Sequence, residues 1–89
     1  MAIFTYGYNL AANVRTLVVP PSTSPQHVCV HNHEHNQNYE IFIGGDDVSL
    51  TNGMHAVATA TGTLTLYPND ALYAITDHDG ANLRILVVR

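Results

Sequence analysis

The stretch TGTLTLYPNDALYAIT, residues 61–76, contains the pattern that decides the fold. Leu64 and Leu66 alternate with threonines, so the leucines lie on one face of a strand and the threonines on the other. Pro68 presets φ for a turn, and residues 71–76 again favour a strand. The stretch therefore predicts two short strands separated by a tight turn.

The rest of the chain repeats this pattern. No segment shows sustained helical periodicity, and turn signals recur every ~8–12 residues, which is typical of all-β proteins. Further strands are expected at residues 3–8, 14–19, 26–32, 39–45, 54–60 and 82–89. We therefore expect an all-β fold, a small single-domain β-sandwich or jelly-roll-like barrel of about eight short strands. Residues 1–89 would form this one β domain, with residues 1–25 as an N-terminal arm plus the first strands.

Charged residues are scarce in this chain. They make up 11% of it, compared with about 25% in ordinary globular proteins, and there is no lysine. Because the cores of protein interfaces are depleted of charge, this composition favours a subunit of an assembly. The formal net charge is −4. With no basic patch to follow phosphates, we expect no direct binding of nucleic acid.

The N-terminal segment and the cysteine count bear on location. Residues 1–19 contain neither a basic leader nor a long apolar run, so we expect no signal peptide, no membrane span and synthesis in a cytoplasm. Cys29 is the only cysteine, so no disulfide can form within the chain. Because Val28 and Val30 flank it, we expect a buried and unreactive thiol.

Residues 31–38, HNHEHNQN, are the most unusual segment. Alternate residues on a strand point to one side, so His31, His33 and His35 could share a metal ion, with Glu40 adding a carboxylate. The segment is also what the polar tip of a hairpin between two strands looks like, at an exposed or intersubunit surface. We favour the hairpin tip, and leave open whether its histidines bind metal or respond to pH.

Two features resemble the cupin family. The spacing His33-x-His35-x4-Glu40 resembles the first metal-binding motif of cupins, and YPNDALYAI resembles the turn and strand of the second. Cupins have a further histidine after that turn, where this chain has Leu72 and Tyr73. The resemblance implies a small metal-binding protein that uses His33, His35 and Glu40.

Enzymatic activity has little other support. No nucleophile–base pair is visible, and Ser49 lies in a turn-like segment without a Gly-x-Ser-x-Gly elbow. We therefore expect no enzyme activity, no catalytic residue and no cofactor. A carbohydrate-binding face built from the tyrosines is a third alternative, although the chain has no tryptophan.

A second resemblance covers residues 26–89. A strand ending in Asn is followed by a polar hairpin, an aliphatic–Tyr–aliphatic–Gly-Gly run, Asp-Val, Asn-Gly, Leu-x-Leu, a proline turn and two final strands. The matching residues are Val30, Asn32, Ile41 to Gly45, Asp47, Val48, Asn52, Gly53, Leu64, Leu66, Pro68, Asp70 to Ile75 and Leu83 to Val88. This order resembles small virion structural proteins of tailed bacteriophages.

The phage resemblance implies a role and partners. It implies a capsid decoration or minor capsid protein that binds the head shell, with a tail, neck or head-closure component as the alternative. Its partners would be the major capsid protein or other virion proteins. We expect a homo-oligomer, with a trimer favoured, located at the capsid surface of the virion and assembled in the host cytoplasm.

Overall fold

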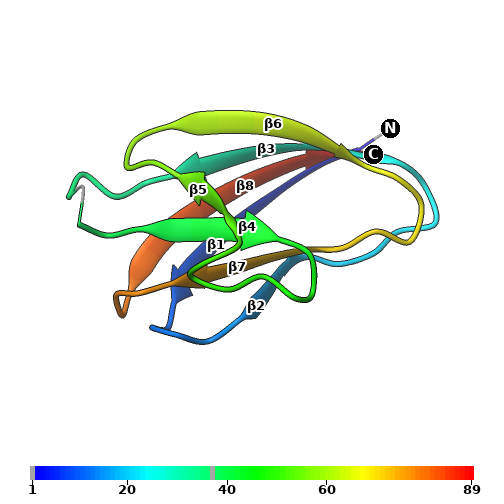
Figure 1. Ribbon diagram of the computed structural model, residues 1–89. Helices are drawn as coiled ribbons and strands as arrows, with labels where there is room; N and C mark the ends of the chain where they lie inside the picture. Colours follow the sequence, from blue (N-terminus) through cyan, green and yellow to red (C-terminus); the bar gives the residue numbers. More distant parts are fainter. Residues whose placement is uncertain (1, 37) are drawn as a thin grey trace.

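The computed structural model describes residues 2–36 and 38–89, which form eight strands and contain no helix (Figure 1). The predicted all-β fold of about eight short strands is confirmed. No helix that could cross a membrane occurs in these two ranges. The strands are β1 (Ile3–Leu10), β2 (Thr16–Val19), β3 (Gln26–Asn32), β4 (Ile41–Gly44), β5 (Met54–Ala56), β6 (Thr61–Leu66), β7 (Leu72–Thr76) and β8 (Ala81–Val88).

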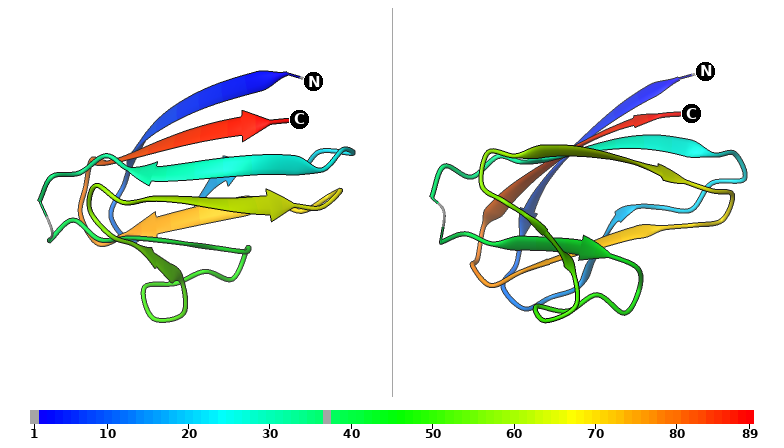
Figure 2. Two further views of the ribbon diagram at one scale, coloured as in Figure 1. Left: turned by 90° about the horizontal axis from the view of Figure 1, so that it is seen from above. Right: turned by 45° about the horizontal axis from the view of Figure 1, so that its top comes forward.

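The strands form two four-stranded antiparallel sheets that face each other as two layers (Figure 2). Sheet A has the order β1-β8-β3-β6, and sheet B has the order β2-β7-β4-β5. Only β4 and β5 are both successive along the chain and paired, and each of the other six connections carries the chain from one sheet to the other. This is the sandwich or jelly-roll-like architecture expected from the sequence.

Strand β8 shows how the sequence pattern builds the core. Leu83, Ile85 and Val87 are almost fully buried, whereas Arg84 and Leu86 between them are exposed. Strand β8 lies in the middle of sheet A, between β1 and β3, so its apolar face meets side chains from the facing sheet. The predicted alternation at the end of the chain is confirmed.

The segment predicted to be a hairpin tip connects the two sheets instead. Strand β3 belongs to sheet A and β4 to sheet B, so the strands on either side of residues 33–40 do not pair. His31 and Asn32 are still part of β3, and Gln37 lies outside the described residues. The hairpin prediction was wrong because alternation identifies a strand without identifying its pairing partner.

The turn at Pro68 also connects the two sheets. Asp70 N donates to Tyr67 O at 3.0 Å, and Asn69 has a φ of 70°. Proline at the second position and a positive φ at the third are typical of a type II turn. This turn passes from β6 in sheet A to β7 in sheet B, so both strands of the opening stretch form, but in different sheets.

Three buried polar side chains anchor the connections between sheets. Gln26 Nε2 donates to Pro20 O at 3.0 Å, Thr76 Oγ1 donates to Glu40 O at 2.7 Å, and Asn32 Nδ2 donates to Ala56 O at 2.7 Å. Within the described ranges, no buried side-chain nitrogen or oxygen lacks a partner. These hydrogen bonds therefore offset the free-energy cost of removing the three polar side chains from water.

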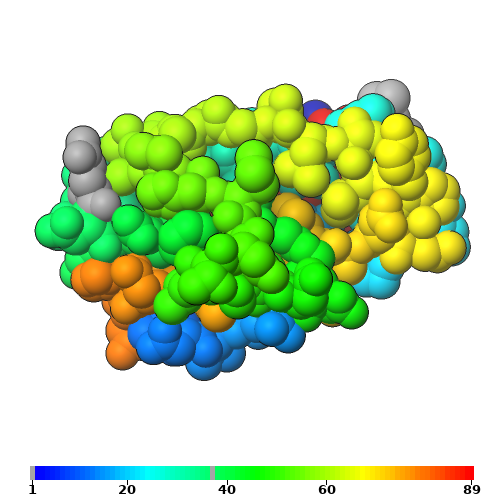
Figure 3. Space-filling view, viewed as in Figure 1, coloured from blue at the N-terminus to red at the C-terminus, as the bar shows by residue number. Residues whose placement is uncertain are grey.

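The connection from β4 to β5 folds over the outer face of sheet B, and it lies at the front of the space-filling view (Figure 3). Its Val48 is 1% exposed but lies outside the main core cluster, against Gly44 and Gly53. A Cβ atom on Gly53 would lie 2.6 Å from Phe42 Cβ, so only glycine fits. Asn-Gly pairs are typical of tight turns, but here the close approach to Phe42 is what requires Gly53.

The N-terminal residues are integrated into both sheets. Strand β1 pairs with β8 over its whole length, and β2 pairs with β7, so residues 3–19 supply first strands and not a free arm. Tyr8 OH donates to Val18 O at 2.8 Å and links β1 to β2. Burial and the neighbouring Tyr6 raise the pKa of the Tyr8 hydroxyl.

Candidate functional site

The outer face of sheet A gathers side chains from four strands that are distant in sequence. It carries the odd-numbered residues of β1, β3 and β6 and the even-numbered residues of β8, since their neighbours point into the core. Three rows cross the sheet: Ile3, Val88, His27 and Thr65; Thr5, Leu86, Cys29 and Thr63; and Gly7, Arg84, His31 and Thr61. Cys29 is therefore half-buried on this outer face, which corrects the prediction of a buried thiol.

This face is almost free of charge. Arg84 is the one charged residue of the eight strands, and it lies between Gly7 and His31 in the third row. All seven carboxylates of the chain are in the segments between strands. Ile3 is 69% exposed and Leu86 is 40% exposed, so the face also shows apolar surface.

The two edges of sheet A are long and carry no charge. Strand β1 has eight residues and β6 has six, and each pairs with another strand on one side only. The edges of sheet B are shorter, with four residues in β2 and three in β5. Edge strands are usually blocked by charge, proline or shortness, because their free backbone groups can pair with another chain. The edges of sheet A carry none of these three features.

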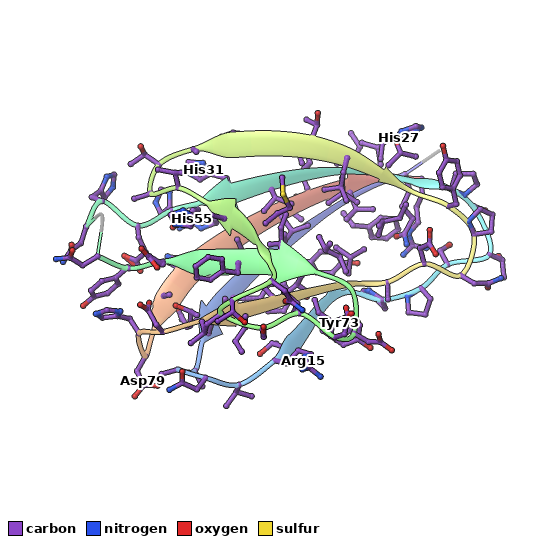
Figure 4. All side chains as sticks on the ribbon, in the orientation of Figure 1. Arg15, His27, His31, His55, Tyr73 and Asp79 are labelled. Atoms are coloured by element: carbon purple, nitrogen blue, oxygen red, sulfur yellow. The ribbon has the colours of Figure 1, made fainter. Side chains whose placement is uncertain are left out.

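The structure brings two of the predicted histidines into contact at the end of β3. His31 Nε2 lies 3.2 Å from His33 Nδ1, and His31 Nδ1 lies 2.9 Å from Thr61 Oγ1 on the neighbouring strand. The His35 ring follows at a centroid distance of 5.7 Å from the His33 ring. His31 lies at one end of β3 and His27 at the other (Figure 4).

The backbone around these histidines is well held. His33 N donates to Asn82 O at 2.9 Å, and Glu34 Oε1 accepts a hydrogen bond from Asn82 N at 2.8 Å. The first bond continues the β3–β8 pairing by one residue, and the second ties the Glu34 side chain to the same residue of β8. His33 is therefore fixed beside His31 by the sheet, and its position does not depend on a mobile turn.

Neighbouring charges act on His33. The Arg84 guanidinium lowers the pKa of His33, and partial desolvation, His31 and His35 act in the same direction. The Glu34 carboxylate opposes them. The result is that the neutral imidazole of His33 is favoured over the cation.

Glu40, the fourth predicted ligand, is held by other partners. Its backbone N donates to Asp77 Oδ1 and its backbone O accepts from Thr76 Oγ1. Thr76 is the last residue of β7, and Asp77 follows it. Across residues 2–36 and 38–89, no group of three or more His, Cys, Asp or Glu side chains is placed to hold a metal ion. The set His31, His33, His35 and Glu40 is thus only partly assembled, with His31 and His33 in contact.

Sequence reasoning missed Arg84 and Thr61 as neighbours of the histidines. Each faces His31 directly in the register of sheet A, Arg84 from β8 and Thr61 from β6. A charged residue in the middle of the apolar run 82–89 was a visible signal that one position of that strand faces outward. The partnership with Thr61 had no signal, because it depends on strand register.

An apolar hollow of about 350 Å³ opens between the free edges of β5 and β6. Val30, Ile43 and Leu64 contribute to its lining from within the sandwich. Met54 on β5 is 74% exposed beside it. The gap between the sheets on this side is therefore lined by apolar side chains and is open to solvent.

Known protein families and curated proteins give no match to this chain. Solved structures do match. An RmlC-like cupin protein from Desulfovibrio desulfuricans has a TM-score of 0.62 at 13% identity, over 97% of this chain and 71% of its own. A Bacillus endospore appendage protein that forms disulfide-linked pili has a TM-score of 0.59 at 8% identity, over 97% and 82%.

A third structure is IMPa from Pseudomonas aeruginosa in complex with an O-glycopeptide. Its TM-score is 0.57 at 12% identity, and the match covers 98% of this chain but 12% of that one. All three likenesses lie at identities that show a shared fold and nothing more. They support the β-sandwich or jelly-roll-like architecture.

Proposed function

We propose that this chain is a structural protein of a bacteriophage virion, a capsid decoration or minor capsid protein that binds and stabilises the head shell. The observation that carries the proposal is sheet A, whose outer face holds Arg84 as its one charge and whose long edges are unprotected. The sequence resemblance over residues 26–89 indicates that the assembly is a bacteriophage virion. On this proposal the protein acts by association, at the capsid surface, and performs no catalysis.

The residues that carry the phage resemblance have structural roles in this fold. Asn32 joins two connecting segments, Gly53 allows a close approach to Phe42, and Pro68 is the second residue of a type II turn. The pattern therefore describes how a small sandwich is built. The pattern supports an architecture shared with virion proteins, and the scarcity of charge on sheet A supports a shared role in assembly.

Sheet A provides the surface for association with the major capsid protein or with other copies of the chain. Strand pairing at β1 or β6 would satisfy the free backbone groups of the edge, and the apolar Ile3 and Leu86 would be covered at the same time. A closed ring of copies leaves no such edge exposed. We therefore expect a homo-oligomer, with a trimer favoured.

The test is whether the protein is part of the particle. Phage particles from the natural source are banded in a density gradient and probed with an antibody raised against this chain. The proposal expects the chain in the particle band, with gold-labelled antibody on the head. Label confined to the tail or neck would favour the alternative of a tail, neck or head-closure component, and absence from the band would refute both.

A cupin-like metal-binding protein using His33, His35 and Glu40 is the candidate from another class. The fold likeness to a cupin and the contact between neighbouring histidines favour it. The backbone of Glu40 is bonded to Asp77 and Thr76, away from the histidines. Elemental analysis of protein purified without a histidine tag separates the two: near-stoichiometric metal that is lost in a Glu40→Gln variant would support the cupin-like candidate.

A further inference from the structure

Two imidazole nitrogens on the outer face of sheet A are separated by the distance of a chelating pair. His31 Nε2 and His33 Nδ1 are 3.2 Å apart, and the two rings are tilted by 57° with centroids 5.3 Å apart. Two nitrogens that bind one tetrahedral zinc ion at about 2.0–2.1 Å are about 3.3 Å from each other. Binding of one ion by both nitrogens requires the His31 and His33 side chains to rotate so that both lone pairs point toward it.

Thr61 determines which nitrogen of His31 is available. Its hydroxyl oxygen lies 2.9 Å from His31 Nδ1, and when it accepts the Nδ1 proton the lone pair of His31 is on Nε2, which faces His33. In this tautomer, His31 Nε2 accepts a hydrogen bond from His33 Nδ1–H. Histidines that bind metals commonly donate their other ring N–H to an oxygen in this way.

We propose that His31 and His33 form a two-histidine binding site for a divalent transition-metal ion such as Zn²⁺, Ni²⁺ or Cu²⁺. Imidazole nitrogen suits these ions and not the hard cations Mg²⁺ and Ca²⁺. The ion takes the place of the proton between the two nitrogens, and His33 then carries its proton on Nε2. Water fills the other coordination positions, since no third ligand is in place in the part of the chain that the structure describes.

This site goes beyond the proposed virion function and does not depend on it. It also differs from the cupin-like hypothesis, because it lies on the outside of the sandwich and does not use Glu40. The charges that face it are Arg84 and Glu34. Arg84 favours the neutral imidazole that a metal requires, and Glu34 offsets its repulsion of a cation.

The chain offers a closely matched control. His27 lies on the same face of β3, and its Nδ1 is 3.3 Å from Thr65 Oγ1 on β6, as His31 is paired with Thr61. No second histidine stands beside His27 in the described structure. Figure 4 shows the two at opposite ends of the strand. A His27→Asn variant therefore removes a histidine–threonine pair without removing a chelating pair.

The test is calorimetric titration of tag-free protein with Zn²⁺ and, separately, with Mg²⁺ at pH 7.5. We expect one Zn²⁺ per chain and no Mg²⁺ binding. The variants His31→Asn and His33→Asn should each weaken Zn²⁺ binding by at least about tenfold, since one donor replaces two. His27→Asn should leave binding unchanged, and His35→Asn should change it by less than about threefold. Absence of Zn²⁺ binding overturns the site, as does an equal loss in His27→Asn or a loss in His35→Asn as large as that in His33→Asn.

Thr61 is tested as a positioning residue by the nitrogen shifts of the imidazole rings. In the metal-free protein, ¹⁵N spectra should show His31 protonated on Nδ1 and bare on Nε2. Thr61→Val should populate the other tautomer and weaken Zn²⁺ binding by about tenfold, the loss typical of removing such a partner. An unchanged tautomer together with unchanged affinity would remove Thr61 from the site.

Discussion

Asn32 Nδ2 donates a hydrogen bond of 2.7 Å to Ala56 O, and this bond joins the end of β3 in sheet A to the end of β5 in sheet B. The Asn32 side chain also accepts a bond from Glu34 N at 3.0 Å, and its backbone O accepts one from Thr59 N. Asn32 is fully buried. Asn32 therefore holds two of the segments that cross between the sheets at this end of the sandwich, residues 33–40 and residues 57–60.

Replacing Asn32 should destabilise the fold strongly. Asn32→Ala leaves Ala56 O and Glu34 N without their partners in a buried place, and we expect a loss of about 2–4 kcal/mol in the free energy of unfolding. Urea denaturation measures it. Asn38→Ala, at an exposed position of the same connection, is the control and should change stability by less than about 0.5 kcal/mol. Equal effects of the two substitutions would contradict the anchoring role.

Gly53 and Gly62 differ in whether the surrounding structure leaves room for a Cβ atom. A Cβ on Gly53 would lie 2.6 Å from Phe42 Cβ and 2.8 Å from Val48 Cγ2, so Gly53→Ala should cost about 1–3 kcal/mol. A Cβ on Gly62 would meet nothing within 4 Å. Gly62→Ala should therefore be neutral or stabilising by up to about 1 kcal/mol. Thermal unfolding of both variants checks the prediction, and a tolerated Gly53→Ala would show that the 45–53 segment does not pack as described.

The Asp77 carboxylate should contribute to the loss of stability in acid. Its hydrogen bond with His78 lowers the pKa of Asp77 below 3.8 in the folded protein. A lowered folded-state pKa stabilises the fold above the unfolded-state pKa, and this stabilisation is lost as pH falls through the folded-state value. The free energy of unfolding should therefore fall less steeply between about pH 5 and pH 2 in Asp77→Asn than in wild type. Asp46→Asn is the control, and parallel wild-type and Asp77→Asn curves would exclude the effect.

Lysine on an edge of sheet A should prevent association without unfolding the chain. Thr63 is exposed on β6, the outer strand of the sheet, so Thr63→Lys places a charge where a partner strand would pair. Light scattering should show an oligomer for wild type and the 9.7 kDa monomer for the variant, with the same circular dichroism. Thr23→Lys, in the exposed loop 20–25, should keep the oligomer. An oligomer that survives Thr63→Lys, and also Thr5→Lys on β1, would exclude both edges as the interface.

The sequence carried enough information for the strands but not for their partners. Alternation located β3 and β8 to within a residue, because inward and outward positions differ in polarity along each strand. Alternation also predicts the outward orientation of Cys29, since Val28 and Val30 both point inward. The prediction of a buried thiol was wrong because the residue between two inward-facing residues of a strand faces outward.

Strand partners and the candidate site depend on contacts between distant residues. The same polar segment, 33–40, fits a hairpin and a crossing between sheets equally well, since both need a solvated connection. The pairing of His31 with Thr61 and Arg84 follows from the register of three strands. Alternation placed His31 and His33 on one side, and the structure brings these two together, whereas the backbone of Glu40 is bonded to Asp77 and Thr76.

The most direct test of the proposed virion role is the copy number of this chain in purified particles. Isotope-labelled peptides allow the chain to be counted against the major capsid protein by mass spectrometry. A decoration or minor capsid protein that covers the head should be present in many copies, in a fixed ratio to the capsid subunit. A handful of copies per particle, or none, would contradict the account.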